Sequence, residues 1–127
     1  MKVLIADRSS EIRSRIRHMI IEYDKDSEVF ETASNKEASY IAFDKKPNVV
    51  ITELDLVDGS GLTLLSEIHD ALPYTVIIVF THLYQTNIEL ISKKLGADYY
   101  LAKPGGFVDI KHIIKDISNS YLRSMSS

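Results

Sequence analysis

One segment decides how this chain folds: Val49-Val50-Ile51-Thr52-Glu53-Leu54-Asp55-Leu56. Its first four residues are all β-branched, and such a short run is typical of a strand that is buried on both faces. A carboxylate has no place in the middle of such a sheet, so we expect Glu53 at the carboxyl end of the strand. In open α/β sheets ligands bind at this edge, which predicts a functional site around Glu53.

Apolar runs of strand length alternate with segments of helical period on both sides of this strand. Strands are predicted at residues 2–6, 28–33, 49–52, 75–80 and 98–102. Ser9 or Ser10 can cap the first helix and Asn35 the second, and Gly96 is placed to end the fourth. The last helix carries its apolar residues up to Tyr121, and residues 124–127 form a polar tail. Successive βα units predict a parallel sheet with right-handed crossovers and helices on both faces.

The bulk composition bounds the kind of protein. A chain of 127 residues is most simply one domain, and it is too short for a closed eight-fold barrel. The net charge of −3 argues against a broad basic surface for nucleic acid. There is no cysteine, which excludes disulfides and thiolate metal sites and fits a cytoplasmic location. No apolar run has the length of a membrane span, and the first residues are too few for a signal peptide.

Polar residues follow the predicted strands at the point where each one ends. Parallel strands place their carboxyl ends at one edge of a sheet, so these side chains are expected to meet there. The residues concerned are Asp7, Arg8, Glu53, Asp55, Thr81, His82 and Lys103.

The chain resembles the receiver domain of two-component response regulators, the CheY-like family. The resemblance rests on five segments: Val3 to Asp7, Lys46 to Thr52, Glu53 to Leu62, Val79 to Thr81, and Leu95 to Pro104. It covers nearly the whole chain, with residues 1–123 as the receiver-like domain. It implies a flavodoxin-like (βα)5 fold with strand order 2-1-3-4-5.

The resemblance also implies roles for the residues at the sheet edge. In the family, two adjacent acids after the first strand hold a magnesium ion, and an aspartate after the third strand takes up a phosphoryl group. The hydroxyl and the lysine at the positions of Thr81 and Lys103 bind the phosphoryl oxygens. An aromatic residue at the position of Tyr100 changes its packing and signals the state to a partner.

This sequence departs from the family pattern at two charged positions. Arg8 replaces the second acid, and arginine has no lone pair to offer a metal ion. Glu53 replaces the aspartate, and its longer side chain can imitate a phosphoryl group better than it can act as the nucleophile. Val57 stands where the family often has proline. We therefore hypothesise a pseudo-receiver in which Arg8 pairs with Glu53, and Lys103 approaches the same carboxylate.

The acidic and basic site residues also have structural interpretations. Asp7 could be a helix-capping acid before Ser9, and Arg8 could be a solvated surface residue. Asp55 could instead be a phosphoacceptor displaced by two residues.

The remaining site residues leave similar alternatives open. Thr81 could simply end a strand, and Tyr100 could be a half-buried strand residue. His82 could screen the site or simply be exposed. The other histidines, His18, His69 and His112, fall on different helices without metal-ligand spacing and are interpreted as surface residues.

Three functions follow from these residues. The first is a signalling module without enzymatic activity or cofactor, which is independent of phosphorylation and contacts a protein partner or output domain. A homodimer through the face of the fourth helix, the fifth strand and the last helix is one form of this contact. The second is a phosphorylatable, Mg²⁺-dependent receiver with unusual site residues. The third is a flavodoxin-like nucleotide or flavin binder, against which the lack of a phosphate-binding loop argues.

Overall fold

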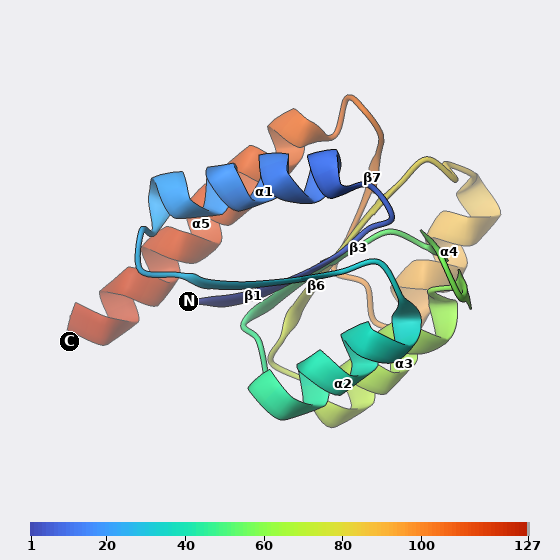
Figure 1. Ribbon diagram of the computed structural model, residues 1–127, viewed down its shortest axis with the longest axis horizontal. Coiled ribbons are helices and arrows are strands. Elements are labelled where there is room, and N and C mark those ends of the chain that lie inside the picture. The colour runs from blue at the N-terminus through green and yellow to red at the C-terminus, as the bar shows by residue number, and fades with distance from the viewer. Residues whose placement is uncertain (127) are drawn as a thin grey trace.

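The computed structural model describes residues 1–126 and shows a five-stranded parallel sheet (Figure 1). Its strands are β1 (Lys2–Ala6), β2 (Glu28–Thr32), β3 (Val49–Thr52), β6 (Val76–Thr81) and β7 (Tyr99–Ala102). They lie in the order β2-β1-β3-β6-β7, and every neighbouring pair is parallel. Since β6 and β7 are the fourth and fifth strands of this sheet along the chain, the predicted 2-1-3-4-5 order is confirmed.

Helices cover both faces of the sheet, as predicted (Figure 1). On one face lie α1 (Ser10–Tyr23) and α5 (Phe107–Ser126). On the other lie α2 (Asn35–Lys45), α3 (Leu62–Ala71) and α4 (Thr86–Lys94). Strand side chains alternate between the two faces, so Val3 and Ile5 pack with α1 and α5, whereas Leu4 and Ala6 join the opposite core.

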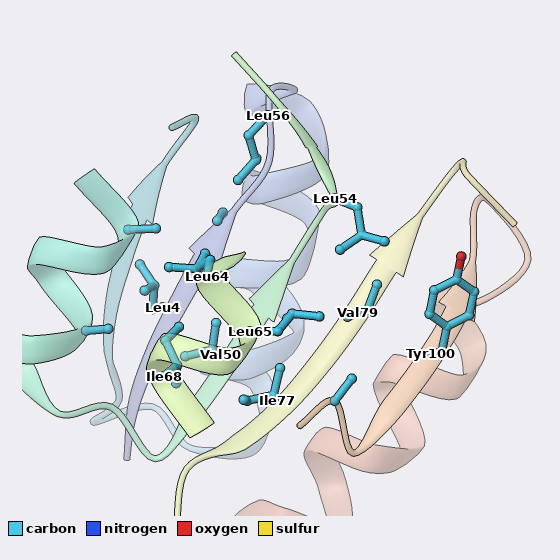
Figure 2. Close-up of a cluster of buried hydrophobic side chains, with 14 residues drawn as sticks. Leu4, Val50, Leu54, Leu56, Leu64, Leu65, Ile68, Ile77, Val79 and Tyr100 are labelled. Atoms are coloured by element: carbon cyan, nitrogen blue, oxygen red, sulfur yellow. The ribbon is translucent and has the colours of Figure 1, made fainter. Parts of the chain in front are cut away.

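The core under α2 and α3 reaches the carboxyl end of the sheet. Figure 2 shows Leu4, Val50 and Val79 on the strands, facing Leu65 and Ile68 of α3. Leu54 and Leu56, which follow β3, are buried in the same core and tie the loop beyond Glu53 to it. The loop after β3 therefore has a fixed position on the sheet.

Of the three helix ends for which the sequence named a capping or stop residue, only the start of α2 differs from the prediction. The Ser9 side chain caps α1 by accepting a hydrogen bond from the amide of Ile12 at 3.2 Å. The cap of α2 is Ser34, not Asn35 as predicted, because both are capping residues and Asn35 is already the first helical residue. Gly96 follows α4 with φ of +119°, a conformation that favours glycine, as its predicted role requires.

The turn predicted at residues 58–61 belongs to a small antiparallel hairpin of β4 (Asp55–Leu56) and β5 (Gly59–Ser60). The Asp58 carboxylate accepts hydrogen bonds from the amides of Asn35 and Lys36 at 2.7 and 3.0 Å. The Asn35 side-chain amide donates to the carbonyls of Gly59 and Ser60, both at 3.1 Å. The hairpin is thus fixed to the start of α2.

The last helix is longer than the sequence indicated. Residues 124–126, part of the predicted polar tail, continue α5, and Ser127 lies outside the described residues. Polar serines are poor markers of a helix end because the preceding apolar period can extend through them.

Candidate functional site

The predicted site residues converge at the carboxyl edge of the sheet. Asp7 follows β1, Glu53 follows β3, Thr81 ends β6 and Lys103 follows β7. The register pairs Ala6 with Thr52, Thr52 with Val79, and Thr81 with Ala102, so these strand ends are level. The parallel sheet therefore brings the four side chains to one place.

Glu53 lies at the centre of the site and its side chain is only 2% exposed. Its Oε1 accepts hydrogen bonds from Lys103 Nζ at 3.0 Å, from His82 Nδ1 at 2.8 Å and from the His82 amide at 3.2 Å. Its Oε2 accepts from the amides of Leu54 at 2.6 Å and Asp55 at 3.4 Å. Both carboxylate oxygens are therefore bound by donors of the same chain.

These donors decide the charge of Glu53. Burial alone would raise the pKa of this carboxyl group, because a buried charge loses its hydration. Hydrogen bonds from Thr81, Lys103 and His82, with the positive charge of Lys103, outweigh burial and lower the pKa from 4.5 to about 2. Glu53 is therefore an anion at neutral pH.

Lys103 joins Glu53 to Asp7. Its Nζ donates to Asp7 Oδ2 at 2.7 Å as well as to Glu53, and its side chain is 14% exposed. Asp7 Oδ1 accepts from the amide of Ser9 at 2.9 Å. Asp7 thus contacts Lys103 at the sheet edge and also binds the backbone just before α1, the two positions that the sequence left as alternatives.

Arg8 does not pair with Glu53, and this part of the hypothesis is wrong within the described residues. Its Nη2 lies 3.7 Å from Asp55 Oδ1 and donates to the Leu56 carbonyl at 3.2 Å. Glu53 turns inward to Lys103 and to backbone amides, so its carboxylate is already occupied. The guanidinium, whose side chain is 53% exposed, avoids the desolvation that a contact with Glu53 would require.

His82 has a larger part in the site than the sequence suggested. Its Nδ1 contacts Glu53, while its Nε2 lies 3.5 Å from Asp55 Oδ2. Its position directly after Thr81, at a strand end, was the available signal. We call the following six residues the charge cluster: Asp7, Arg8, Glu53, Asp55, His82 and Lys103.

The charge cluster is connected to Tyr100 through the loop after β6. The buried Thr81 hydroxyl accepts a hydrogen bond from the Leu83 amide at 3.0 Å. The Tyr100 hydroxyl donates to the Leu83 carbonyl, and the Tyr84 ring lies 5.6 Å from the Tyr100 ring. Burial raises the pKa of the Tyr100 phenol, so it remains a donor at neutral pH. Figure 2 shows this hydroxyl directed toward the carboxyl end of the sheet.

Two positively charged side chains, Lys103 and Arg8, stand among the carboxylates at this edge. Lys103 Nζ lies between the carboxylates of Asp7 and Glu53, at the position where a metal ion would be attracted by both negative charges. Arg8 offers no lone pair. Among residues 1–126, no group of three or more histidine, aspartate or glutamate side chains is arranged to hold a metal ion.

The family model described as "Response regulator receiver domain" matches residues 3–115. The chain belongs to the response regulator receiver domain family. The predicted family is therefore confirmed. No helix of this receiver domain, over residues 1–126, combines the length and apolar character needed to cross a membrane.

Curated relatives of this receiver domain are longer proteins. It is 34% identical to a protein-glutamate methylesterase/protein-glutamine glutaminase 2 of Carboxydothermus hydrogenoformans, over 100% of this chain and 36% of the relative. It is 33% identical to the oxygen regulatory protein NreC of Staphylococcus epidermidis, over 81% of this chain and 48% of that protein. The chain thus spans roughly a third to a half of the length of these relatives.

Solved receiver structures share the fold. A CheY-like receiver domain from Methanospirillum hungatei superposes with a TM-score of 0.83 at 23% identity, covering 97% of each chain. The receiver domain of AraT from Geobacillus stearothermophilus gives 0.81 at 27% identity, covering 98% of this chain and 97% of that one. The flavodoxin-like architecture predicted from the sequence is therefore confirmed.

Proposed function

We propose that this receiver domain signals through protein contacts without being phosphorylated. The strongest support is that hydrogen-bond donors of the same chain already bind the Glu53 carboxylate. Its two oxygens accept hydrogen bonds from Lys103, His82 and two backbone amides. A nucleophilic carboxylate needs an accessible lone pair, whereas the Glu53 side chain is 2% exposed. Arg8 adds a positive charge where the family has an acid.

Glu53 itself takes the place of the phosphoryl group in this proposal. Its carboxylate accepts a hydrogen bond from Lys103, and the Thr81 hydroxyl helps to lower its pKa; these two residues match the family's phosphoryl-binding lysine and hydroxyl. Thr81 also positions Leu83, which holds the Tyr100 hydroxyl. The domain is thereby kept in the state that a phosphoryl group would favour, with the Tyr100 ring buried.

The surface that presents this state is formed by α4, β7 and α5. The exposed apolar side chains of these elements include Leu90, Ile91, Tyr99 and Val108. We propose that this face binds a protein partner, an output domain or a second copy of the domain. The greater length of the curated relatives supports an output domain in the whole protein.

Mass spectrometry after incubation with Mg²⁺ and acetyl phosphate tests the proposal. We expect no added phosphoryl group on the native chain. A phosphoryl group on Glu53 would contradict the proposal, and one on Asp55, whose side chain is 41% exposed, would support the phosphorylatable receiver instead.

The double variant Arg8→Asp with Glu53→Asp is the matched positive control. It restores an acidic pair after β1 and shortens the carboxylate after β3, so Mg²⁺ binding and phosphoryl uptake should return. A variant that folds but recovers neither would show that more than these two positions separates the domain from phosphorylatable receivers.

A further inference from the structure

His82 is placed between two carboxylates, and each of its ring nitrogens faces one of them. Nδ1 lies 2.8 Å from Glu53 Oε1 and Nε2 lies 3.5 Å from Asp55 Oδ2. An ionised carboxylate only accepts hydrogen bonds, and a neutral imidazole has a single N–H. A neutral ring would therefore direct a lone pair at one of the two anions, whereas an imidazolium donates to both.

The charges around the ring favour the same protonation state. Three carboxylates of the charge cluster face two permanent cations, so one positive charge is lacking. The groups concerned are Asp7, Glu53 and Asp55 against Arg8 and Lys103. Lys103 shares Glu53 Oε1 with the ring, and Arg8 lies on the other oxygen of Asp55. An imidazolium at His82 makes the charge cluster neutral.

We propose that His82 is a pH-dependent switch that controls the α4–β7–α5 surface by gaining or losing one proton. This inference rests on the proposed function, because protonation here takes the regulatory place that phosphorylation has in the family. Imidazole changes its charge between about pH 5 and 8, within the physiological range. The side chain is 53% exposed, so water can exchange protons with it directly.

The loop that carries His82 connects the ring to the surface. The His82 amide donates to Glu53, and the next residue, Leu83, accepts from the Tyr100 hydroxyl. When the ring loses its proton, it can donate to only one of the two carboxylates. The His82 backbone is then held less firmly to Glu53, and Leu83 is held less firmly to Tyr100. The expected direction is therefore a fixed loop at low pH and a released loop as the pH rises.

Helix α4, which follows this loop, is weakly fixed and can respond. It has nine residues, and its N-cap, Gln85, forms no side-chain capping bond within the described part of the chain. Ser92 is its only buried residue, and the Ser92 hydroxyl has no hydrogen-bond partner among the described residues. A short helix with few buried side chains unfolds locally at a lower free-energy cost than the core of the fold.

Histidine NMR combined with amide hydrogen exchange tests the switch on the whole chain. At pH 7 we expect less imidazolium at His82 in Asp55→Asn and in Glu53→Gln than in the native chain, because each variant removes one of the two anions that face the ring. Exchange at the Leu83 amide, which donates to the Thr81 hydroxyl, should accelerate several-fold between about pH 6 and 8 after correction for its intrinsic pH dependence. His82→Gln should abolish this acceleration, whereas the matched variant His18→Gln should keep it.

Two results would overturn the switch. One is a His82 ring whose titration responds to neither carboxylate variant. The other is loop exchange that does not follow the His82 titration. Neither measurement involves phosphate, so failure of the switch is separate from failure of the proposed function, which the mass of the acetyl phosphate product decides.

Discussion

The two halves of the charge cluster differ in their exposure to water. The inner half consists of Asp7, Glu53 and Lys103, whose side chains are 5%, 2% and 14% exposed. The outer half consists of Arg8, Asp55 and His82, at 53%, 41% and 53%. Buried charges are costly to leave unpaired, whereas exposed ion pairs contribute little. We therefore expect the inner half to determine stability and the outer half to determine response to conditions.

The largest effect is expected from Lys103→Met. Methionine keeps an apolar side chain near Phe80, where Lys103 Nζ now lies 5.7 Å from the ring, but leaves Asp7 and Glu53 as neighbouring buried anions. Breaking such a pair costs about 3–5 kcal/mol. Urea denaturation at neutral pH measures the loss of unfolding free energy, part of which should return in acid as the carboxylates take up protons.

Lys93→Met is the control for Lys103→Met. Lys93 forms an exposed pair with Glu89 one helical turn away, at 3.2 Å, and its removal should cost no more than about 0.5 kcal/mol. Equal losses in the two variants would mean that burial does not set the free-energy cost of removing a paired lysine.

The second effect is a pH dependence that Glu53→Gln removes. The unfolded chain binds a proton at this carboxyl near pH 4.5, while the folded chain holds it ionised down to about pH 2. Acid therefore favours the unfolded state, and the contribution of Glu53 is complete above pH 4.5 and is lost as the pH falls toward 2. The difference corresponds to roughly 3 kcal/mol.

Chemical denaturation of the native chain and Glu53→Gln between about pH 2 and 6 measures this contribution. The native chain should lose more stability than the variant across this range. Glu22→Gln, at an exposed position on α1, should follow the native curve. Parallel curves for all three proteins would contradict the lowered pKa of Glu53.

A smaller effect is expected from Tyr100→Phe, at the connection between the charge cluster and the surface. The variant keeps the buried ring but leaves the Leu83 carbonyl without its donor, which costs about 1 kcal/mol. Hydrogen exchange at the Leu83 amide should accelerate more than the loss of global stability explains. Tyr74→Phe, at a ring that is 97% exposed, should change neither quantity.

The sequence was sufficient for the inner half of the charge cluster and for the fold. Each member of that half directly follows a predicted strand, and level strand ends place such residues together whatever their rotamers. The alternation of apolar runs and helical periods predicted the parallel sheet, and the family resemblance implied its strand order. These features depend on backbone topology, to which many residues contribute.

The outer half could not be predicted in the same way, because it depends on single side chains and on the β4–β5 hairpin. Strands of two residues have no readable period, so Asp55 gave no sign that it would face Arg8. The N-cap of α2 was equally hard to predict from the sequence. Ser34 and Asn35 are neighbours that both favour the capping position, and the structure uses Ser34. Opposite charge alone suggested that Arg8 pairs with Glu53. The free-energy cost of removing the guanidinium from water opposes that pair.

Of the variants at the charge cluster, Arg8→Ala should have the smallest effect on stability. It therefore tests the difference between the buried inner half and the exposed outer half. The guanidinium forms a 3.7 Å pair with Asp55 and a hydrogen bond to the Leu56 carbonyl in a half-exposed position. We expect a loss below about 1 kcal/mol that shrinks further as salt screens the pair. Denaturation at low and high ionic strength measures both. A loss of unfolding free energy as large as that of Lys103→Met would mean that Arg8 behaves like the buried inner half, because only a desolvated ion pair contributes that much.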